Sequence, residues 1–83
     1  MKNYTYKTSG VCSSRIAFDI DDEGRLRNVV FTGGCNGNLK GIGALTEGMK
    51  AEEAAEKLAG IRCGFKNTSC PDQLAKAIRS IDR

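Results

Sequence analysis

The sequence contains no histidine, no tryptophan and a single proline, Pro71, among its 83 residues. Without histidine, the chain cannot build a Ser-His-Asp or Cys-His catalytic site, and it cannot form a zinc finger with mixed cysteine and histidine ligands. It also has no apolar run near the roughly 20 residues that a membrane span requires. Residues 1–14 lack the apolar stretch typical of a secretion signal, so we expect a cytoplasmic protein with no membrane association.

The chain is long enough for one small domain, which we expect to cover residues 1–83. Its composition, 40% hydrophobic and 28% charged, is typical of a globular protein. A domain of this size buries only about 60–65% of its unfolded surface, so a metal, a partner protein or a second copy in a homodimer would add stability. The net charge of +3 is not gathered into a basic block, and aromatic residues are few, so we do not expect nucleic-acid binding. Nothing in the sequence indicates a small-molecule substrate.

The first half of the chain has the pattern of β-strands. Residues 4–8 are rich in β-formers, and Ile16, Phe18 and Ile20 alternate with more polar residues. After a short acidic turn, residues 25–32 are again rich in β-forming residues, which predicts an antiparallel hairpin. We therefore expect a small three-stranded antiparallel sheet with residues 4–8 at its edge.

The second half has the pattern of helices. One helix is predicted to begin near residue 37 and end near residue 47; we attribute its Gly41 and Gly43 to close packing against the sheet. A second is predicted over residues 51–59, and a third opens at the chain's only proline, with Cys70 as its N-cap. Strands followed by helices predict an α+β fold with about three helices on one face of the sheet.

The four cysteines are the residues that carry chemistry in this chain: Cys12, Cys35, Cys63 and Cys70. Their spacing contains no CxxC pair, so it is neither a zinc ribbon nor a thioredoxin motif. In a reducing compartment, cysteine clusters more often bind metal or perform redox chemistry than form disulfides. Spacing alone leaves disulfides, buried thiols, a metal site and redox thiols as open alternatives.

The neighbours of these cysteines favour a metal site. Cys35 lies in a glycine-rich segment before a predicted helix, and Cys70 lies at the start of another, where partial positive charge stabilises a thiolate. Four thiolates suit tetrahedral zinc or iron. Asp72 is a possible additional oxygen ligand, although an acidic residue in a first helical turn also interacts favourably with the helix dipole. The competing hypothesis is a redox thiol protein that uses Cys63 and Cys70, which are close enough in sequence to bridge.

Residues 68–72 spell TSCPD, and a glycine-rich segment, GGCNGNLKGIGALTEGM, surrounds Cys35. On these motifs and the cysteine set, the chain from Gly10 to Ile81 resembles the TSCPD-domain family. Members of that family occur as small stand-alone proteins and near the C-terminus of cobalamin-dependent ribonucleotide reductases. The resemblance implies that all four cysteines are metal ligands and that the chain is an accessory relative of ribonucleoside-diphosphate reductase. A chain of 83 residues has no room for the barrel-sized scaffold of a reductase, so we expect a non-catalytic module.

The chain is also similar, more distantly, to iron–sulfur scaffold proteins of the NifU/IscU type. The order of a cysteine before a strand, a hairpin ending in a glycine-flanked cysteine, and a cysteine opening the last helix is the same. Ser14 and Ser69 stand where the scaffold has an aspartate and a histidine. The resemblance implies a cluster set of Cys12, Cys35 and Cys70, with Cys63 extra. From the two departures we infer a more permanently held metal, with Cys63 replacing the histidine.

Overall fold

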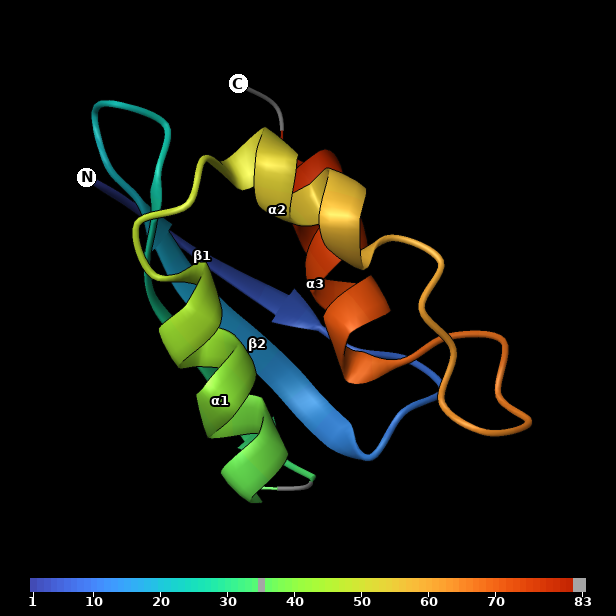
Figure 1. Ribbon diagram of the computed structural model, residues 1–83. Helices are drawn as coiled ribbons and strands as arrows, with labels where there is room; N and C mark the ends of the chain where they lie inside the picture. The colour runs from blue at the N-terminus through green and yellow to red at the C-terminus, as the bar shows by residue number, and fades with distance from the viewer. Residues whose placement is uncertain (35, 82–83) are drawn as a thin grey trace.

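The computed structural model describes residues 1–34 and 36–81, and places a three-stranded sheet beneath three helices (Figure 1). The strands are β1 (Lys2–Lys7), β2 (Ser13–Ile20) and β3 (Leu26–Gly33), and both pairings are antiparallel. The strand order β1-β2-β3 leaves β1 at an edge, which confirms the prediction for this strand.

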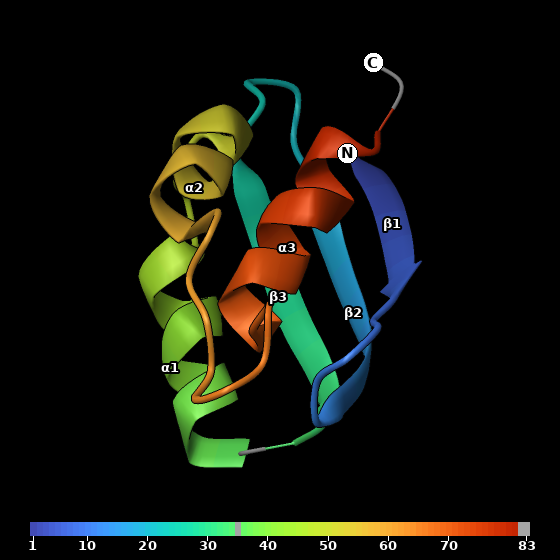
Figure 2. The same cartoon turned by 90° about the vertical axis from the view of Figure 1, so that its right-hand side faces the viewer.

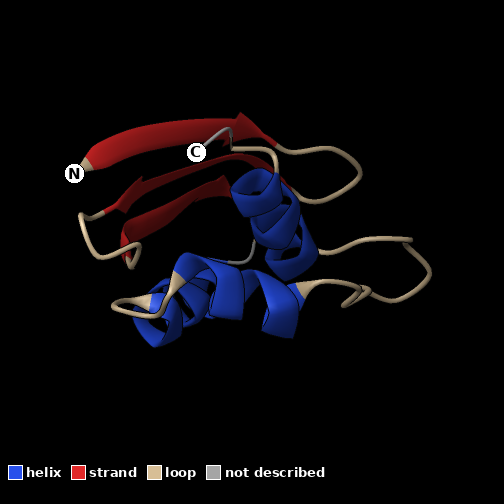
Figure 3. Cartoon of the chain, turned by 90° about the horizontal axis from the view of Figure 1, so that it is seen from above, coloured by secondary structure: helices blue, strands red, loops and turns tan. Residues whose placement is uncertain are grey.

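The helices are α1 (Asn36–Thr46), α2 (Ala51–Leu58) and α3 (Cys70–Arg79). Seen from above, all three lie on the same side of the sheet, and the other face of the sheet is open (Figure 3). The predicted α+β fold with helices on one face is confirmed. Helix α1 packs on β3, and α2 packs on α3, which covers the centre of the sheet (Figure 2).

The core lies between the sheet and the helices. Ile16, Phe18 and Ile20 all point into it, as their alternation predicts, and none is more than 6% exposed. Their partners from α3 are Leu74 and Ile78, which lie on one face of that helix. Three alanines of α2 are also buried, and these small side chains permit close packing of the two helices: Ala51, Ala54 and Ala55.

The two glycines of α1 serve different purposes. A Cβ atom added to Gly43 would lie 2.7 Å from the carbonyl oxygen of Val29, so α1 approaches β3 too closely for a side chain there. A Cβ atom added to Gly41 would meet nothing within 4 Å. The prediction of close helix-to-sheet packing is therefore confirmed for Gly43 and wrong for Gly41.

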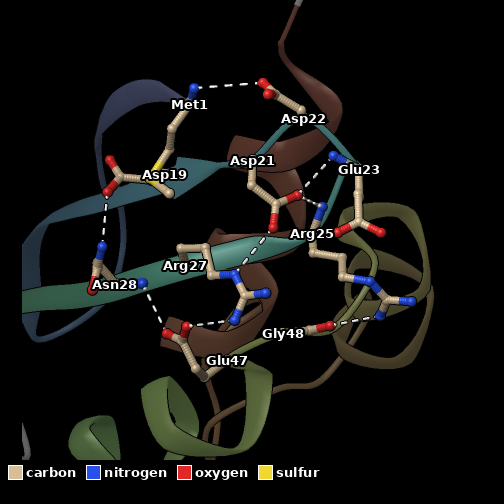
Figure 4. Close-up of polar contacts among 10 residues, drawn as sticks. All are labelled: Met1, Asp19, Asp21, Asp22, Glu23, Arg25, Arg27, Asn28, Glu47 and Gly48. Atoms are coloured by element: carbon tan, nitrogen blue, oxygen red, sulfur yellow. Dashed lines mark hydrogen bonds and ion pairs between the residues drawn. The ribbon is translucent and has the colours of Figure 1, made fainter.

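A polar network closes the end of the molecule formed by the β2–β3 turn (Figure 4). Glu47, just after α1, accepts hydrogen bonds from the backbone N–H of Asn28 at 2.9 Å and from Arg27 at 3.2 Å. Arg27 also bonds Asp21 at 3.1 Å. Asn28 has a φ of 57°, within a register shift of the β2–β3 pairing. Hydrogen bonds to Asn28 and Arg27 lower the pKa of Glu47. The network ties α1 to the hairpin.

Candidate metal centre at the cysteine end

The opposite end of the molecule brings together four ends of secondary structure: the start of β2, the end of β3, and the starts of α1 and α3 (Figures 1 and 2). We call it the cysteine end, because Cys12, Cys35 and Cys70 each adjoin one of these positions in the sequence. The antiparallel pairing of Ser13 with Gly33 aligns the start of β2 with the end of β3. Cys35 lies outside the described residues, but Gly34 and α1 on either side of it are described.

Cys70 is the first residue of α3, and its sulfur lies against β2. Its Sγ atom is 3.1 Å from the hydroxyl oxygen of Ser13, and both residues are less than 10% exposed. The contact joins the sulfur that opens α3 to the residue that follows Cys12. Anions are stabilised at the N-terminus of a helix, so this position suits a sulfur that carries negative charge.

Ser69, not Cys70, is the N-cap of α3, so that sequence prediction is wrong. The Ser69 hydroxyl accepts a hydrogen bond from the backbone N–H of Asp72 at 3.1 Å and donates one to the carbonyl of Ile61 at 2.6 Å. A hydroxyl oxygen is a better acceptor for this role than a thiol. Because Ser69 caps the helix, the sulfur of Cys70 is left to contact Ser13.

Cys12 lies against the segment that leads to Cys35. A Cβ atom added to Gly34 would come within 3.1 Å of the Cys12 sulfur and within 3.2 Å of the backbone nitrogen of Ser13. Gly34 also has a φ of 79°, a conformation that favours glycine. The glycine therefore allows the chain to pass closely over Cys12 just before Cys35. These contacts put Cys12, Gly34 and Cys70 around Ser13.

Cys63 occupies a different setting, on an exposed loop between α2 and α3. Its backbone N–H donates to the carbonyl of Thr68 at 3.1 Å, and its carbonyl accepts from the backbone N–H of Lys66 at 3.0 Å. Its side chain is exposed, whereas that of Cys70 is buried. Within residues 1–34 and 36–81, no three cysteine or acidic side chains are gathered closely enough to hold a metal ion. The membership of all four cysteines in a shared metal site stays a prediction.

Asp72 is a buried structural residue of the α3 start. Its carboxylate accepts hydrogen bonds from the Gly60 backbone N–H at 2.7 Å and from the Thr68 hydroxyl, and Lys76 lies 3.5 Å away. The hydrogen bonds from Thr68 and Gly60 lower the pKa of Asp72, and the charge of Lys76 adds to the effect. Both carboxylate oxygens are thus engaged within the protein, and we leave Asp72 out of the ligand set proposed below.

Gln73 is a buried residue that sequence reasoning missed. Its side-chain oxygen accepts from the backbone N–H of Ser9 at 3.1 Å, and its nitrogen donates to the Thr68 hydroxyl at 3.0 Å. It therefore fixes the segment before Cys12 to the start of α3. A glutamine beside an aspartate in a first helical turn has the pattern of an exposed residue, so no sequence feature distinguishes it.

The chain belongs to the TSCPD domain family, whose model matches residues 2–81. No curated protein and no solved structure matches the chain. The similarity to iron–sulfur scaffold proteins therefore stays a prediction. In the part of the chain that the structure describes, no helix is both long and apolar enough to cross a membrane.

Proposed function

We propose that this TSCPD-domain protein is a non-catalytic metal-binding module that holds zinc or an iron–sulfur cluster through cysteine thiolates. The proposed ligands are Cys12, Cys35, Cys63 and Cys70. The observation that carries the proposal is the contact of the Cys70 sulfur with Ser13, together with the close approach of the Cys12 sulfur to Gly34. Two cysteines from distant parts of the sequence thus adjoin one serine, next to the segment that enters Cys35.

The chemistry of the available donors fits these two metal groups. In a chain with no histidine, and with Asp72 already hydrogen-bonded, the remaining strong ligands at the cysteine end are sulfur atoms. Thiolate sets select zinc and iron–sulfur clusters over magnesium or calcium. Metal binding would also link the start of β2 to the starts of α1 and α3, and so would stabilise a small fold.

The four proposed ligands differ in how firmly the fold holds them. Cys70 is fixed by helix α3 and its contact with Ser13, and Cys12 directly precedes β2. Cys63 lies on an exposed loop, so its loss would remove a ligand without disturbing a packed element. We therefore expect Cys70→Ser to abolish metal retention and Cys63→Ser to weaken it.

The test is the metal content of protein prepared without oxygen, with thiols intact. The expected result is close to one zinc ion per chain, or the iron and acid-labile sulfide of one cluster. Each Cys→Ser variant should lower the content, whereas Ser14→Ala, a change at an exposed serine near Cys12, should not. Less than about a tenth of an equivalent of metal in the unaltered protein would overturn the proposal.

A thiol-redox or reductase-accessory role is the second candidate, and the exposure of Cys63 on the loop leading to Cys70 favours it. Mass spectrometry after mild oxidation distinguishes the two candidates. A reversible Cys63–Cys70 bridge in metal-free protein would support the redox role. Metal retention without such a bridge would support the metal module.

A further inference from the structure

The segment between α2 and α3 projects from the cysteine end as a loop with every side chain exposed, which we call the 60–67 loop (Figure 1, orange). Phe65 shows 109% of its reference area to solvent, and Ile61 shows 43%. Burying an exposed phenylalanine side chain against a partner is strongly favourable, because its large apolar surface leaves water. A fully exposed aromatic side chain at the tip of a loop is thus a strong potential anchor for a partner.

The base of the 60–67 loop is held in one conformation by hydrogen bonds. The carbonyl of Ile61 accepts from the Ser69 hydroxyl at 2.6 Å, and the Gly60 N–H donates to Asp72 at 2.7 Å. Inside the loop, Cys63 and Lys66 close a turn through a backbone hydrogen bond of 3.0 Å. A surface that is already ordered loses less conformational entropy on binding.

An open hollow of about 480 Å³ lies beside the loop. Its lining combines Phe65 and Lys66 from the loop with Tyr6 at the end of β1 and Lys76 from α3. Gln73, which is buried and hydrogen-bonded, also lines the hollow. The hollow is therefore open and is bordered by two aromatic and two lysine side chains, of which Lys76 is already paired with Asp72.

The 60–67 loop lies outside the stretch that holds most of the acidic residues. Of the ten acidic residues, eight lie within residues 19–56, and the other two are Asp72, which is buried, and Asp82. The loop itself carries two basic residues, Arg62 and Lys66, and no acidic residue. Among the residues that the structure describes, Arg62 and Lys66 form no ion pair. Their charges are available to an acidic partner.

We propose that the 60–67 loop and its hollow form a docking surface for an acidic segment of a partner protein. An apolar side chain of that segment packs on Phe65, and its carboxylates pair with Arg62 and Lys66. Aromatic and arginine anchors are typical of the residues that dominate protein interfaces, and complementary charge speeds their association. The single aromatic in the loop, and a net charge of only +3 that forms no basic block, favour a protein segment over a nucleic acid.

The test begins with a random peptide library displayed on phage and selected on the intact protein, with counter-selection on the Phe65→Ala/Lys66→Glu variant. The selected peptides should be rich in Asp and Glu and carry at least one apolar residue. Synthetic versions of them, measured by fluorescence anisotropy, should bind at least about tenfold more weakly to Phe65→Ala and to Lys66→Glu. Affinity should also fall as salt is added.

Two matched controls lie away from the loop. Leu45→Ala removes another exposed apolar side chain, from α1, and Lys2→Glu reverses a charge at the far end of β1; both should leave peptide affinity within about twofold. Circular dichroism verifies that each variant is folded. Selected peptides without acidic bias, or peptides that bind Phe65→Ala unchanged, would overturn the proposal. So would tighter binding of a single-stranded oligonucleotide through the same residues, or self-association of the chain through them.

Discussion

Replacing Asp72 removes the acceptor that connects three parts of the cysteine end. In Asp72→Ala, the Gly60 backbone N–H and the Thr68 hydroxyl lose their charged partner, and Lys76 loses an ion pair. A hydrogen bond to a charged group contributes about 1.5–3 kcal/mol. The exposed Gly60 N–H can turn to water, and Lys76 is 55% exposed, so we expect a loss of about 2–4 kcal/mol rather than the full sum.

Urea unfolding followed by far-ultraviolet circular dichroism measures this loss, because the chain has no tryptophan for a fluorescence assay. For a domain of this size, 2–4 kcal/mol corresponds to a fall of roughly 10–30 °C in Tm. Asp22→Ala is the matched control, since the Asp22 side chain is 99% exposed and its pairing with the N-terminus should contribute less than about 0.5 kcal/mol. A loss below about 1 kcal/mol for Asp72→Ala would refute the role of Asp72 as a buried anchor.

The same carboxylate makes stability depend on acidity in a defined direction. The folded protein lowers the pKa of Asp72, so the ionised form favours folding. Its contribution is complete above the unfolded pKa of about 3.9 and is lost as the pH falls through the lower folded value. Asp72→Asn cannot titrate, so its stability should fall less than that of the unaltered protein between about pH 5 and 2. Equal slopes for the two proteins would contradict the assignment.

Two further predictions concern α1 and the network at the turn end. Gly43→Ala should destabilise the fold by about 1–3 kcal/mol, because its Cβ would meet the Val29 carbonyl. Gly41→Ala should stabilise the fold by about 0.5–1 kcal/mol, because its Cβ would meet nothing. Urea unfolding midpoints that shift in the same direction for the two variants would contradict this prediction. Because the pKa of Glu47 is lowered from its ordinary 4.5, the nuclear magnetic resonance shift of the Asn28 amide should titrate below that pH, and Glu47→Ala should abolish the titration. A transition at or above pH 4.5 would contradict the hydrogen bond.

The elements of the fold were predictable because their patterns repeat over several residues. The alternation of Ile16, Phe18 and Ile20 gives β2, and Leu74 and Ile78 give the buried face of α3. Single positions were harder to predict, because they depend on contacts between distant segments. Nothing local distinguishes Gly43 from Gly41, since the difference lies in a carbonyl of β3 that only the folded chain brings close.

The cysteine end shows the same limit. Sequence reasoning took Pro71 as the first residue of the last helix and therefore Cys70 as its cap, whereas the helix begins at Cys70 and Ser69 caps it. The contact of Cys70 with Ser13 spans 57 positions of the sequence and follows from the packing of α3 on β2. The spacing of the cysteines does not determine such contacts, so all four proposed ligands stay predictions.

The five residues of the TSCPD motif explain why the proposed metal site and the proposed docking surface belong to one structural unit. Ser69 caps α3 and bonds Ile61, and Asp72 holds Gly60, so the motif that fixes Cys70 also fixes the base of the 60–67 loop. A change at Asp72 should therefore affect metal retention and peptide binding together. A change at Phe65 should affect peptide binding alone, because that side chain is fully exposed and takes no part in the buried contacts of the cysteine end. Metal retention that falls in the Phe65→Ala variant would show that the two surfaces are not separable in this way.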